Sequence, residues 1–126
     1  MNGSFDIDTL ELLDETDEVY IETRRDARSP EHRTIVWVVV VEGKVFVRSV
    51  RGNKGRWYRE ISSNPEGVLY VGNNRIPVRA DPATDEATVN AVSEAYRSQY
   101  EEAWPGPTAG MVRPGVLPTT LKLSPA

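Results

Sequence analysis

Residues 34–50 read TIVWVVVVEGKVFVRSV, and this stretch decides the fold. It begins with a near-continuous β-branched run, which predicts a strand covered on both faces. Glu42-Gly43 interrupts the run, and apolar and polar residues then alternate from Lys44 to Ser49. Gly43 can supply the positive φ that a tight turn commonly needs. The stretch therefore predicts a β-hairpin.

The elements on either side predict further short strands and few helices. Expected helices cover residues 8–15, with Asp8 as the N-cap, 54–64, and 84–103, with Thr84 as the cap. Expected strands cover residues 19–24, 34–41, 44–50, 68–71, 75–80 and 119–123. Residues 25–32 read as a polar connection, and 105–118 as an irregular Pro/Gly-rich connection to the final strand. Six short strands predict a mainly β single domain over residues 1–126, a small antiparallel barrel with flanking helices, preceded by an acidic helix or arm at 1–18.

Composition excludes several classes of protein. The 126 residues contain no cysteine, so a disulfide framework, a thiolate nucleophile and a cysteine-bound zinc are impossible. The amino terminus lacks the basic and apolar regions of a signal peptide, and we expect it to remain in the mature protein. The longest apolar run has seven residues, against roughly 20 for a membrane-spanning helix. These features predict a soluble, cytoplasmic protein without a membrane partner.

Charge is distributed unevenly along the chain, whose formal net charge is −4. Residues 1–31 hold ten acids and three bases, 32–79 hold three acids and nine bases, and 80–126 hold six acids and three bases. Five cations fall within twelve residues of the middle segment: Arg48, Arg51, Lys54, Arg56 and Arg59. The middle segment is thus a candidate anion-binding region, whereas the acidic chain as a whole argues against nucleic acid as a partner.

An anion site would use the residues that follow the hairpin. Arg48 and Arg51 offer guanidinium forks, Ser49 offers a hydroxyl, and the turn at Gly52 can present backbone N–H groups. The alternative is that surface arginines and lysines are simply solvated. For Lys54, Arg56 and Arg59 we favour that alternative, because helical spacing places Trp57, Tyr58 and Ile61 on the opposite, inward face. The spacing of Tyr96 and Tyr100 likewise predicts core packing.

Four motifs give the chain a family resemblance. They are Thr34 with Trp37, the turn Arg48-Ser49-Val50-Arg51-Gly52, the pair Trp57-Tyr58, and the tail Thr120-Leu121-Lys122-Leu123-Ser124-Pro125. Over residues 19–123 the chain resembles the flavin- and deazaflavin-binding split-barrel superfamily, which includes pyridoxamine-phosphate-oxidase-like proteins and deazaflavin-dependent nitroreductases. More narrowly, it is similar to a small bacterial family of unknown function with that fold.

The resemblance implies a cofactor, FMN or a deazaflavin, bound to a split β-barrel that forms a homodimer. It assigns the cofactor phosphate to two strand regions, and hence to Arg33, Thr34, Arg48, Ser49, Arg51 and Gly52. Trp37 and Trp57 would lie near the ring or in the core. The implied activity is that of a nitroreductase-like oxidoreductase, in which the ring carries hydride or electrons.

No catalytic residue and no metal site is evident in the sequence. His32 is the only histidine and reads as polar surface, and the acidic residues 14–18 lack the spacing and glycine of a calcium loop. The alternative to a cofactor-dependent enzyme is a non-catalytic barrel that binds a nucleotide, a nucleic acid or a protein through its basic patch.

Overall fold

The computed structural model describes residues 4–16 and 18–126. The acidic segment predicted at 1–18 therefore includes residues 1–3 and 17, which lie outside the described part of the chain. The helices are α1 (Ile7–Glu15), α2 (Arg56–Ser63), α3 (Glu86–Tyr100) and α4 (Pro105–Met111), with 3₁₀ turns η1 (Gly52–Lys54) and η2 (Leu117–Thr119). The strands are β1 (Val19–Thr23), β2 (His32–Val36), β3 (Val38–Val41), β4 (Lys44–Val47), β5 (Glu66–Val71), β6 (Asn74–Pro82) and β7 (Leu121–Pro125).

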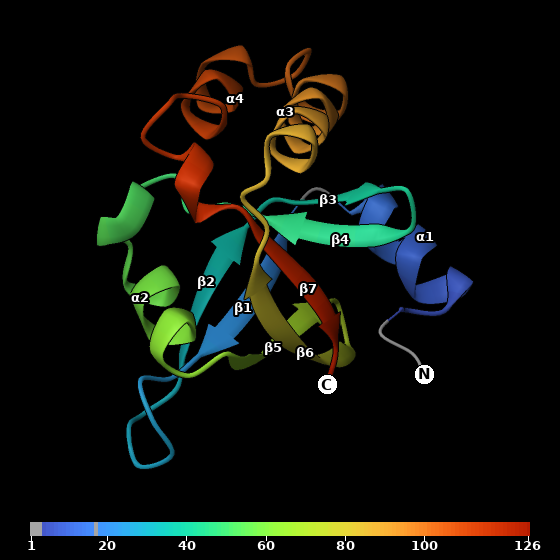
Figure 1. Ribbon diagram of the computed structural model, residues 1–126. Helices are drawn as coiled ribbons and strands as arrows, with labels where there is room; N and C mark the ends of the chain where they lie inside the picture. The colour runs from blue at the N-terminus through green and yellow to red at the C-terminus, as the bar shows by residue number, and fades with distance from the viewer. Residues whose placement is uncertain (1–3, 17) are drawn as a thin grey trace.

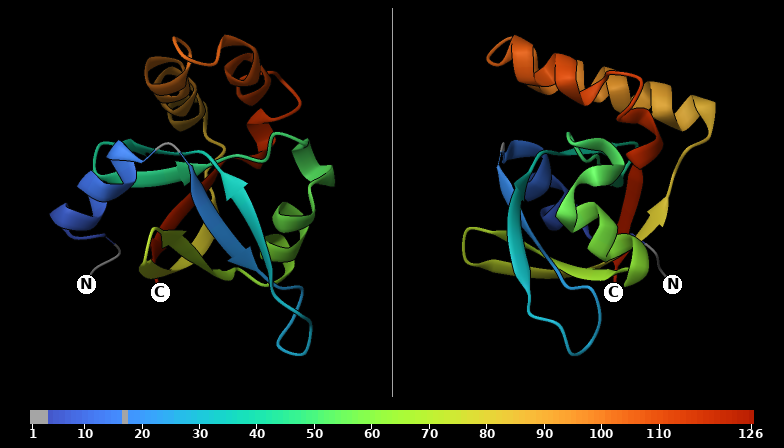
Figure 2. Two further views of the ribbon diagram at one scale, coloured as in Figure 1. Left: turned by 180° about the vertical axis from the view of Figure 1, so that it is seen from behind. Right: turned by 90° about the vertical axis from the view of Figure 1, so that its left-hand side faces the viewer.

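The strands form one antiparallel sheet in the order β2-β1-β5-β6-β7-β4-β3. Figure 1 shows the sheet curled on itself, with α3 and α4 above it and α2 beside the ends of β1 and β2. In Figure 2 the same two helices lie across the sheet as a separate layer. The predicted split β-barrel with flanking helices is confirmed.

The predicted hairpin is also confirmed. β3 pairs with β4 from Val38 opposite Val47 to Val41 opposite Lys44. Glu42 and Gly43 have φ values of 50° and 76°. Positive φ at both central residues is the requirement of a type I′ turn, whose twist matches that of the flanking strands.

The expectation of one strand over residues 34–41, covered on both faces, is wrong. β2 ends at Val36 and β3 begins at Val38, and the two strands occupy opposite edges of the sheet order. Only one residue, Trp37, separates them in sequence, so the sheet must curl until its edges approach each other. Ile35 on β2 is 47% exposed, so the face of the strand that carries it is not covered.

Other elements depart from expectation in their detail. The chain has seven described strands instead of six, since the long run contributes two. The connection at 105–118 contains α4, whose first residue is a proline, a residue well suited to the first helical position. The caps of α1 and α3 are Asp6 and Asp85, whose carboxylates accept hydrogen bonds from the N–H groups of Thr9 and Thr88.

Two apolar clusters hold the layers together. One fills the curl of the sheet, and the other lies between β3–β4 and the helices α3 and α4. In the second cluster Tyr96 and Tyr100 are fully buried and donate hydrogen bonds to the carbonyls of Trp37 and Val38, at 2.7 Å and 2.9 Å. Their predicted packing role is confirmed, and their hydroxyls fix the backbone where β2 passes into β3.

Candidate cofactor site

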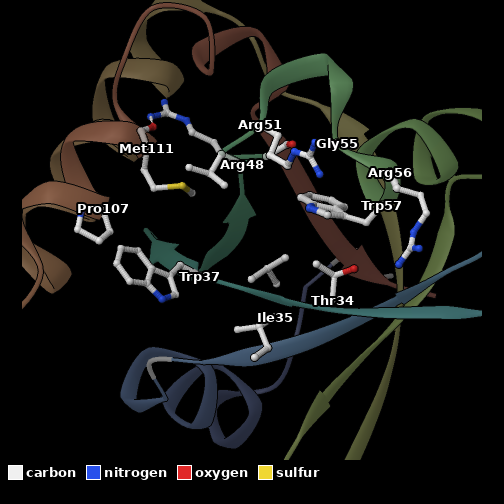
Figure 3. Close-up of a pocket in the computed structure, with 13 residues that line it drawn as sticks. Thr34, Ile35, Trp37, Arg48, Arg51, Gly55, Arg56, Trp57, Pro107 and Met111 are labelled. Atoms are coloured by element: carbon white, nitrogen blue, oxygen red, sulfur yellow. Dashed lines mark hydrogen bonds between the residues drawn. The ribbon is translucent and has the colours of Figure 1, made fainter.

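A cavity of about 430 Å³ opens where β2, the end of β4, α2 and α4 meet (Figure 3). This volume lies in the range of roughly 300–1,000 Å³ that is usual for small-molecule sites. Six of the eight residues predicted to bind a cofactor line it: Thr34, Trp37, Arg48, Ser49, Arg51 and Trp57. Residues from 34 to 57 therefore converge on one cavity, together with Pro107 and Met111 from α4.

Aromatic rings stand on two sides of the cavity. In Figure 3 Trp37 lies beside Pro107 on one side, and Trp57 lies below Arg51 on the other. Trp37 stacks on Tyr100 with ring centroids 4.2 Å apart and an angle of 4° between the planes. Trp57 belongs to the barrel core and is 6% exposed. Both rings are held by packing, which prepares two fixed apolar walls for a planar ligand.

Arg48 is 1% exposed, and its guanidinium group points toward α3 and α4. It donates hydrogen bonds to Thr120 Oγ1 at 2.8 Å, Ser93 Oγ at 2.9 Å, the Met111 carbonyl at 3.1 Å and the Val89 carbonyl at 2.8 Å. A guanidinium group has five N–H donors, so four are already engaged with the protein. Arg48 therefore anchors the helical layer to the end of β4.

The charge of Arg48 is balanced by no carboxylate within ion-pairing distance in the described part of the chain. Burial lowers its pKa, because an apolar surrounding disfavours the charged form. The ordinary pKa of arginine is so high that the group stays charged near neutral pH. The cavity wall consequently carries a positive potential that favours an anion.

Ser49 is the residue most suited to a ligand. It is 1% exposed, and its Oγ has no hydrogen-bond partner, while its backbone N–H donates to Thr119 Oγ1 at 3.0 Å. Buried polar atoms in proteins nearly always have a partner. A Cβ on Gly55 would lie 2.5 Å from Ser49 Oγ, so the hydroxyl fits at this position only because residue 55 is a glycine.

Gly55 is also the N-cap of α2, and it provides no side chain to cap the helix. The first turn of α2 contains no acidic residue and begins with Arg56. Free N–H groups and the helix dipole make such a terminus favourable for anions. Arg51, Arg56 and Ser49 line the same cavity, so this corner brings together the kinds of donor that a phosphate group requires.

Arg33 and Gly52 lie outside the described lining of the cavity. Arg33 donates to Glu22 Oε1 at 3.1 Å and lies 3.9 Å from the ring centre of Tyr70, on the outer face of the sheet. Gly52 has a φ of 66° and donates its N–H to the Ser49 carbonyl at 2.9 Å, so it closes the turn that contains Arg51.

Two features of this region could not be read from the sequence. The need for glycine at position 55 has no signal in sequence, because it depends on the approach of Ser49 in space. His32 is also more than polar surface: its Nδ1 lies 2.8 Å from Glu60 Oε2, and Thr23 Oγ1 donates to Glu60 Oε1 at 2.8 Å. The one sign in the sequence was the position of Glu60 beside Ile61 on the expected helix, which placed a carboxylate near the inward face.

Two features are absent from residues 4–16 and 18–126. None of the helices described there has the length and apolar character needed to span a membrane. Within those same ranges, no three His, Cys, Asp or Glu side chains gather as metal ligands.

The fold and the cavity together define a split-barrel protein with a cavity of small-molecule size between its sheet and its helices. Residues 9–123 match the family described as "Uncharacterized protein conserved in bacteria (DUF2255)", and the chain belongs to that family. None of the curated proteins with which it was compared matches it.

Solved structures share the fold at low sequence identity. HutZ, the heme storage protein from Vibrio cholerae, has a TM-score of 0.69 and 14% identity, covering 100% of this chain and 92% of HutZ. A putative pyridoxamine 5'-phosphate oxidase from Listeria innocua has a TM-score of 0.61 and 11% identity, and the match covers 94% of this chain and 90% of that one. An F420-H2 dependent reductase, FDR-A, has a TM-score of 0.61 and 14% identity, and the match covers 86% of this chain and 93% of FDR-A. Two further matched chains are longer, and this chain covers 54% and 51% of them.

Proposed function

We propose that the cavity binds FMN or a deazaflavin and that the protein is a flavin- or deazaflavin-dependent oxidoreductase of the nitroreductase type. The observation that carries this proposal is the buried, unpartnered Ser49 Oγ beside Gly55, at the uncapped start of α2. A phosphate oxygen placed there would receive the hydroxyl and the helix N–H groups, with Arg51 and Arg56 close by. The likeness to FDR-A and to the putative oxidase supports the same class of ligand.

Each part of such a ligand has residues of this chain to hold it. Ser49, Arg51 and Arg56 would hold the phosphate, and Thr34 would add a hydroxyl. Trp37 and Trp57 would confine the ring, and Ile35 and Met111 would keep water from it. The bound ring supplies the hydride or electron transfer, while these residues bind and orient it. Arg48 acts through its field and through the anchorage of α3 and α4, since its donors are engaged.

The same cavity suits haem less well, although HutZ is described as a heme storage protein. Haem iron in proteins is commonly held by His, Cys, Tyr, or a His and Met pair. Among the described residues that line this cavity, Met111 is the single member of that set. His32 lies elsewhere, in contact with Glu60. We therefore favour a flavin.

We further propose that a second copy of the chain covers the open side of the cavity. Ile35, Val50 and Trp104 are 47%, 49% and 41% exposed, and all lie in or beside the cavity wall. Tyr20, opposite Ile35 on β1, extends the apolar surface and is 47% exposed. Large exposed apolar side chains that adjoin one another commonly mark an interface.

The test is a thermal-shift titration with FMN and with a deazaflavin. We expect a rise in Tm that saturates with ligand, because a ligand that binds only the folded state stabilises it. Ser49→Ala should weaken the affinity for the ligand, as fitted from this titration, by about tenfold or more. The reason is that a hydrogen bond to a charged group is worth about 1.5–3 kcal/mol. Without ligand the same variant should be at least as stable as the wild type, because it removes an unpartnered buried hydroxyl.

Ser62→Ala is the matched control, because Ser62 is exposed on α2 and its hydroxyl donates to the Tyr58 carbonyl. It should leave the ligand response unchanged. A Tm that stays constant under saturating FMN and deazaflavin would overturn the proposal. Binding of oligonucleotide that weakens steeply with salt would instead support the non-catalytic alternative.

A further inference from the structure

We propose a second anion-binding site, for an oxyanion such as a phosphate or carboxylate group, on the flank of α2. A cavity of about 410 Å³ lies there, lined by Arg25, Arg56, Arg59, Glu60 and Ser63. Three positive charges and one negative charge make its lining basic. The site is separate from the proposed flavin cavity, and Arg56 lines both. The proposal does not depend on the proposed function.

The three arginines converge from two elements. Arg56 and Arg59 are three residues apart on α2 and so lie on one face of the helix. Arg25 comes from the loop that follows β1, and its carbonyl accepts a hydrogen bond from Ser63 Oγ at 3.2 Å. Asn64 adds a bond to the Arg24 carbonyl at 3.4 Å. These contacts hold the start of the loop against the end of α2.

The one acid of the lining is committed to other partners. Glu60 is 9% exposed, and its two oxygens contact Thr23 Oγ1 and His32 Nδ1, each at 2.8 Å. Within residues 4–16 and 18–126, Arg56 and Arg59 have no ion pair, and Arg25 has a loose one with the exposed Asp26 at 3.6 Å.

Three like charges around one cavity repel one another, and two of them lie at the helical spacing where like charges destabilise. A bound anion would relieve this repulsion. Guanidinium forks match the two oxygens of a carboxylate or phosphate, so an oxyanion fits this lining better than a halide. The lining thus supplies the positive charge and the type of donor that such a group requires.

His32 provides a direct readout, because it is the only histidine and gives one set of imidazole signals. It touches Glu60, which lines the site. The experiment follows the imidazole ¹⁵N resonances while inorganic phosphate or succinate is added to the ligand-free protein at constant ionic strength set with sodium chloride. Calorimetry on the same samples measures binding directly. The two arms separate phosphate from carboxylate recognition.

We expect a saturable shift in at least one arm, accompanied by heat. Arg59→Gln should weaken binding about tenfold, because it removes one charged donor. Arg79→Gln, an exposed arginine on β6 outside the cavity, is the matched control and should bind as the wild type does. Arg51→Gln should leave the shift of the His32 resonances unchanged, since Arg51 lines the two other cavities and not this one.

Three results would overturn the proposal: no binding in either arm, a shift that sodium chloride reproduces, or equal binding by the Arg59→Gln variant. Loss of the His32 shift in Arg51→Gln would place the anion in the proposed flavin cavity and would overturn the second site as well. Failure here is distinguishable from failure of the flavin proposal, because the FMN-induced rise in Tm is measured separately on the Ser49→Ala and Arg59→Gln variants.

Discussion

Arg48 and Ser49 are neighbours in sequence, and both are buried, yet their polar groups have opposite situations. The guanidinium group of Arg48 has four protein partners, while the hydroxyl of Ser49 has none. A buried polar group with hydrogen-bond partners stabilises the fold. A buried polar group without a partner lowers the stability of the fold, and a ligand that bonded to it would remove that cost. The resemblance named both residues as phosphate ligands, and the structure divides their roles.

Arg48→Met should lower the free energy of unfolding by about 2–4 kcal/mol, because it leaves several buried acceptors without a donor. Urea unfolding measures the change. Arg51→Met is the control: Arg51 is exposed, so its effect on stability should stay within about 0.5 kcal/mol. Equal stability of the two variants would show that the Arg48 hydrogen bonds contribute little.

The family resemblance pointed to the six lining residues, through motifs that lie between residues 34 and 57. It could not identify the partners of Arg48, since Ser93, Met111 and Thr120 are 45, 63 and 72 residues away. The contacts of Arg33 with Glu22 and Tyr70 could not be predicted from the sequence either, because they depend on how three strands pair.

Helix α2 is the element on which both proposed anion sites depend. Its first residue, Arg56, lines both cavities. The N-terminus of the helix borders the proposed flavin cavity, and Arg59 and Glu60 line the cavity of the second proposed site. The inward face carries Trp57 and Ile61 into the barrel core. The short helix is therefore fixed by packing and can hold its polar groups in place without a side-chain cap.

Gly55→Ala should destabilise the protein by about 1–3 kcal/mol, since the added methyl group would lie 2.5 Å from Ser49 Oγ. The backbone of Gly55 is extended, with a φ of −62°, so alanine adds no conformational strain. The double variant Ser49→Ala with Gly55→Ala should recover most of the loss. A double-mutant cycle by urea unfolding measures this coupling, and additive effects would contradict the predicted contact.

The cap of α3 gives the protein an acid-sensitive element. The pKa of Asp85 is lowered, first by its side-chain hydrogen bond with Thr88 and then by a bond to the Thr88 backbone. A carboxylate with a lower pKa in the folded state contributes stability above its unfolded value of 3.8, and loses it as the pH falls through the folded pKa.

Asp85→Ala should therefore lower Tm at neutral pH and have a smaller effect well below pH 3.8. Asp85→Asn should stay close to the wild type at neutral pH, because asparagine also caps helices. Thermal unfolding at several pH values measures both. If Asp85→Ala lowered Tm by the same amount at every pH, the charge of the carboxylate would have no part in the cap.

At the scale of the whole molecule, the division of residues 34–41 into two strands is the decisive feature. The sequence predicted the β-branched run and the hairpin, because these depend on local preference and turn chemistry. The break at Trp37 was not predictable from those preferences, since each residue of the run favours a strand. Tertiary contacts impose it: Trp37 stacks on Tyr100, and its carbonyl accepts from Tyr96.

The proposed second copy predicts a change in mass. The wild-type protein should behave in analytical ultracentrifugation as a particle of twice 14.1 kDa. Ile35→Glu should yield monomers, because it places a charge in the proposed apolar interface. Ile7→Glu is the matched control, since Ile7 is 67% exposed on α1 and lies away from the cavity lining. A monomeric wild-type protein, or monomers from both variants, would contradict this interface.

The position of the tryptophans gives the molecule a built-in optical signal. The chain has three, and Trp37 and Trp57 line the proposed flavin cavity while the ring of Trp104 lies 5.7 Å from that of Trp37. All of the indole emission therefore originates in or beside one site, at wavelengths that flavins absorb. A flavin that entered would quench the fluorescence of the entire chain, so occupancy could be followed in the untagged, unlabelled protein.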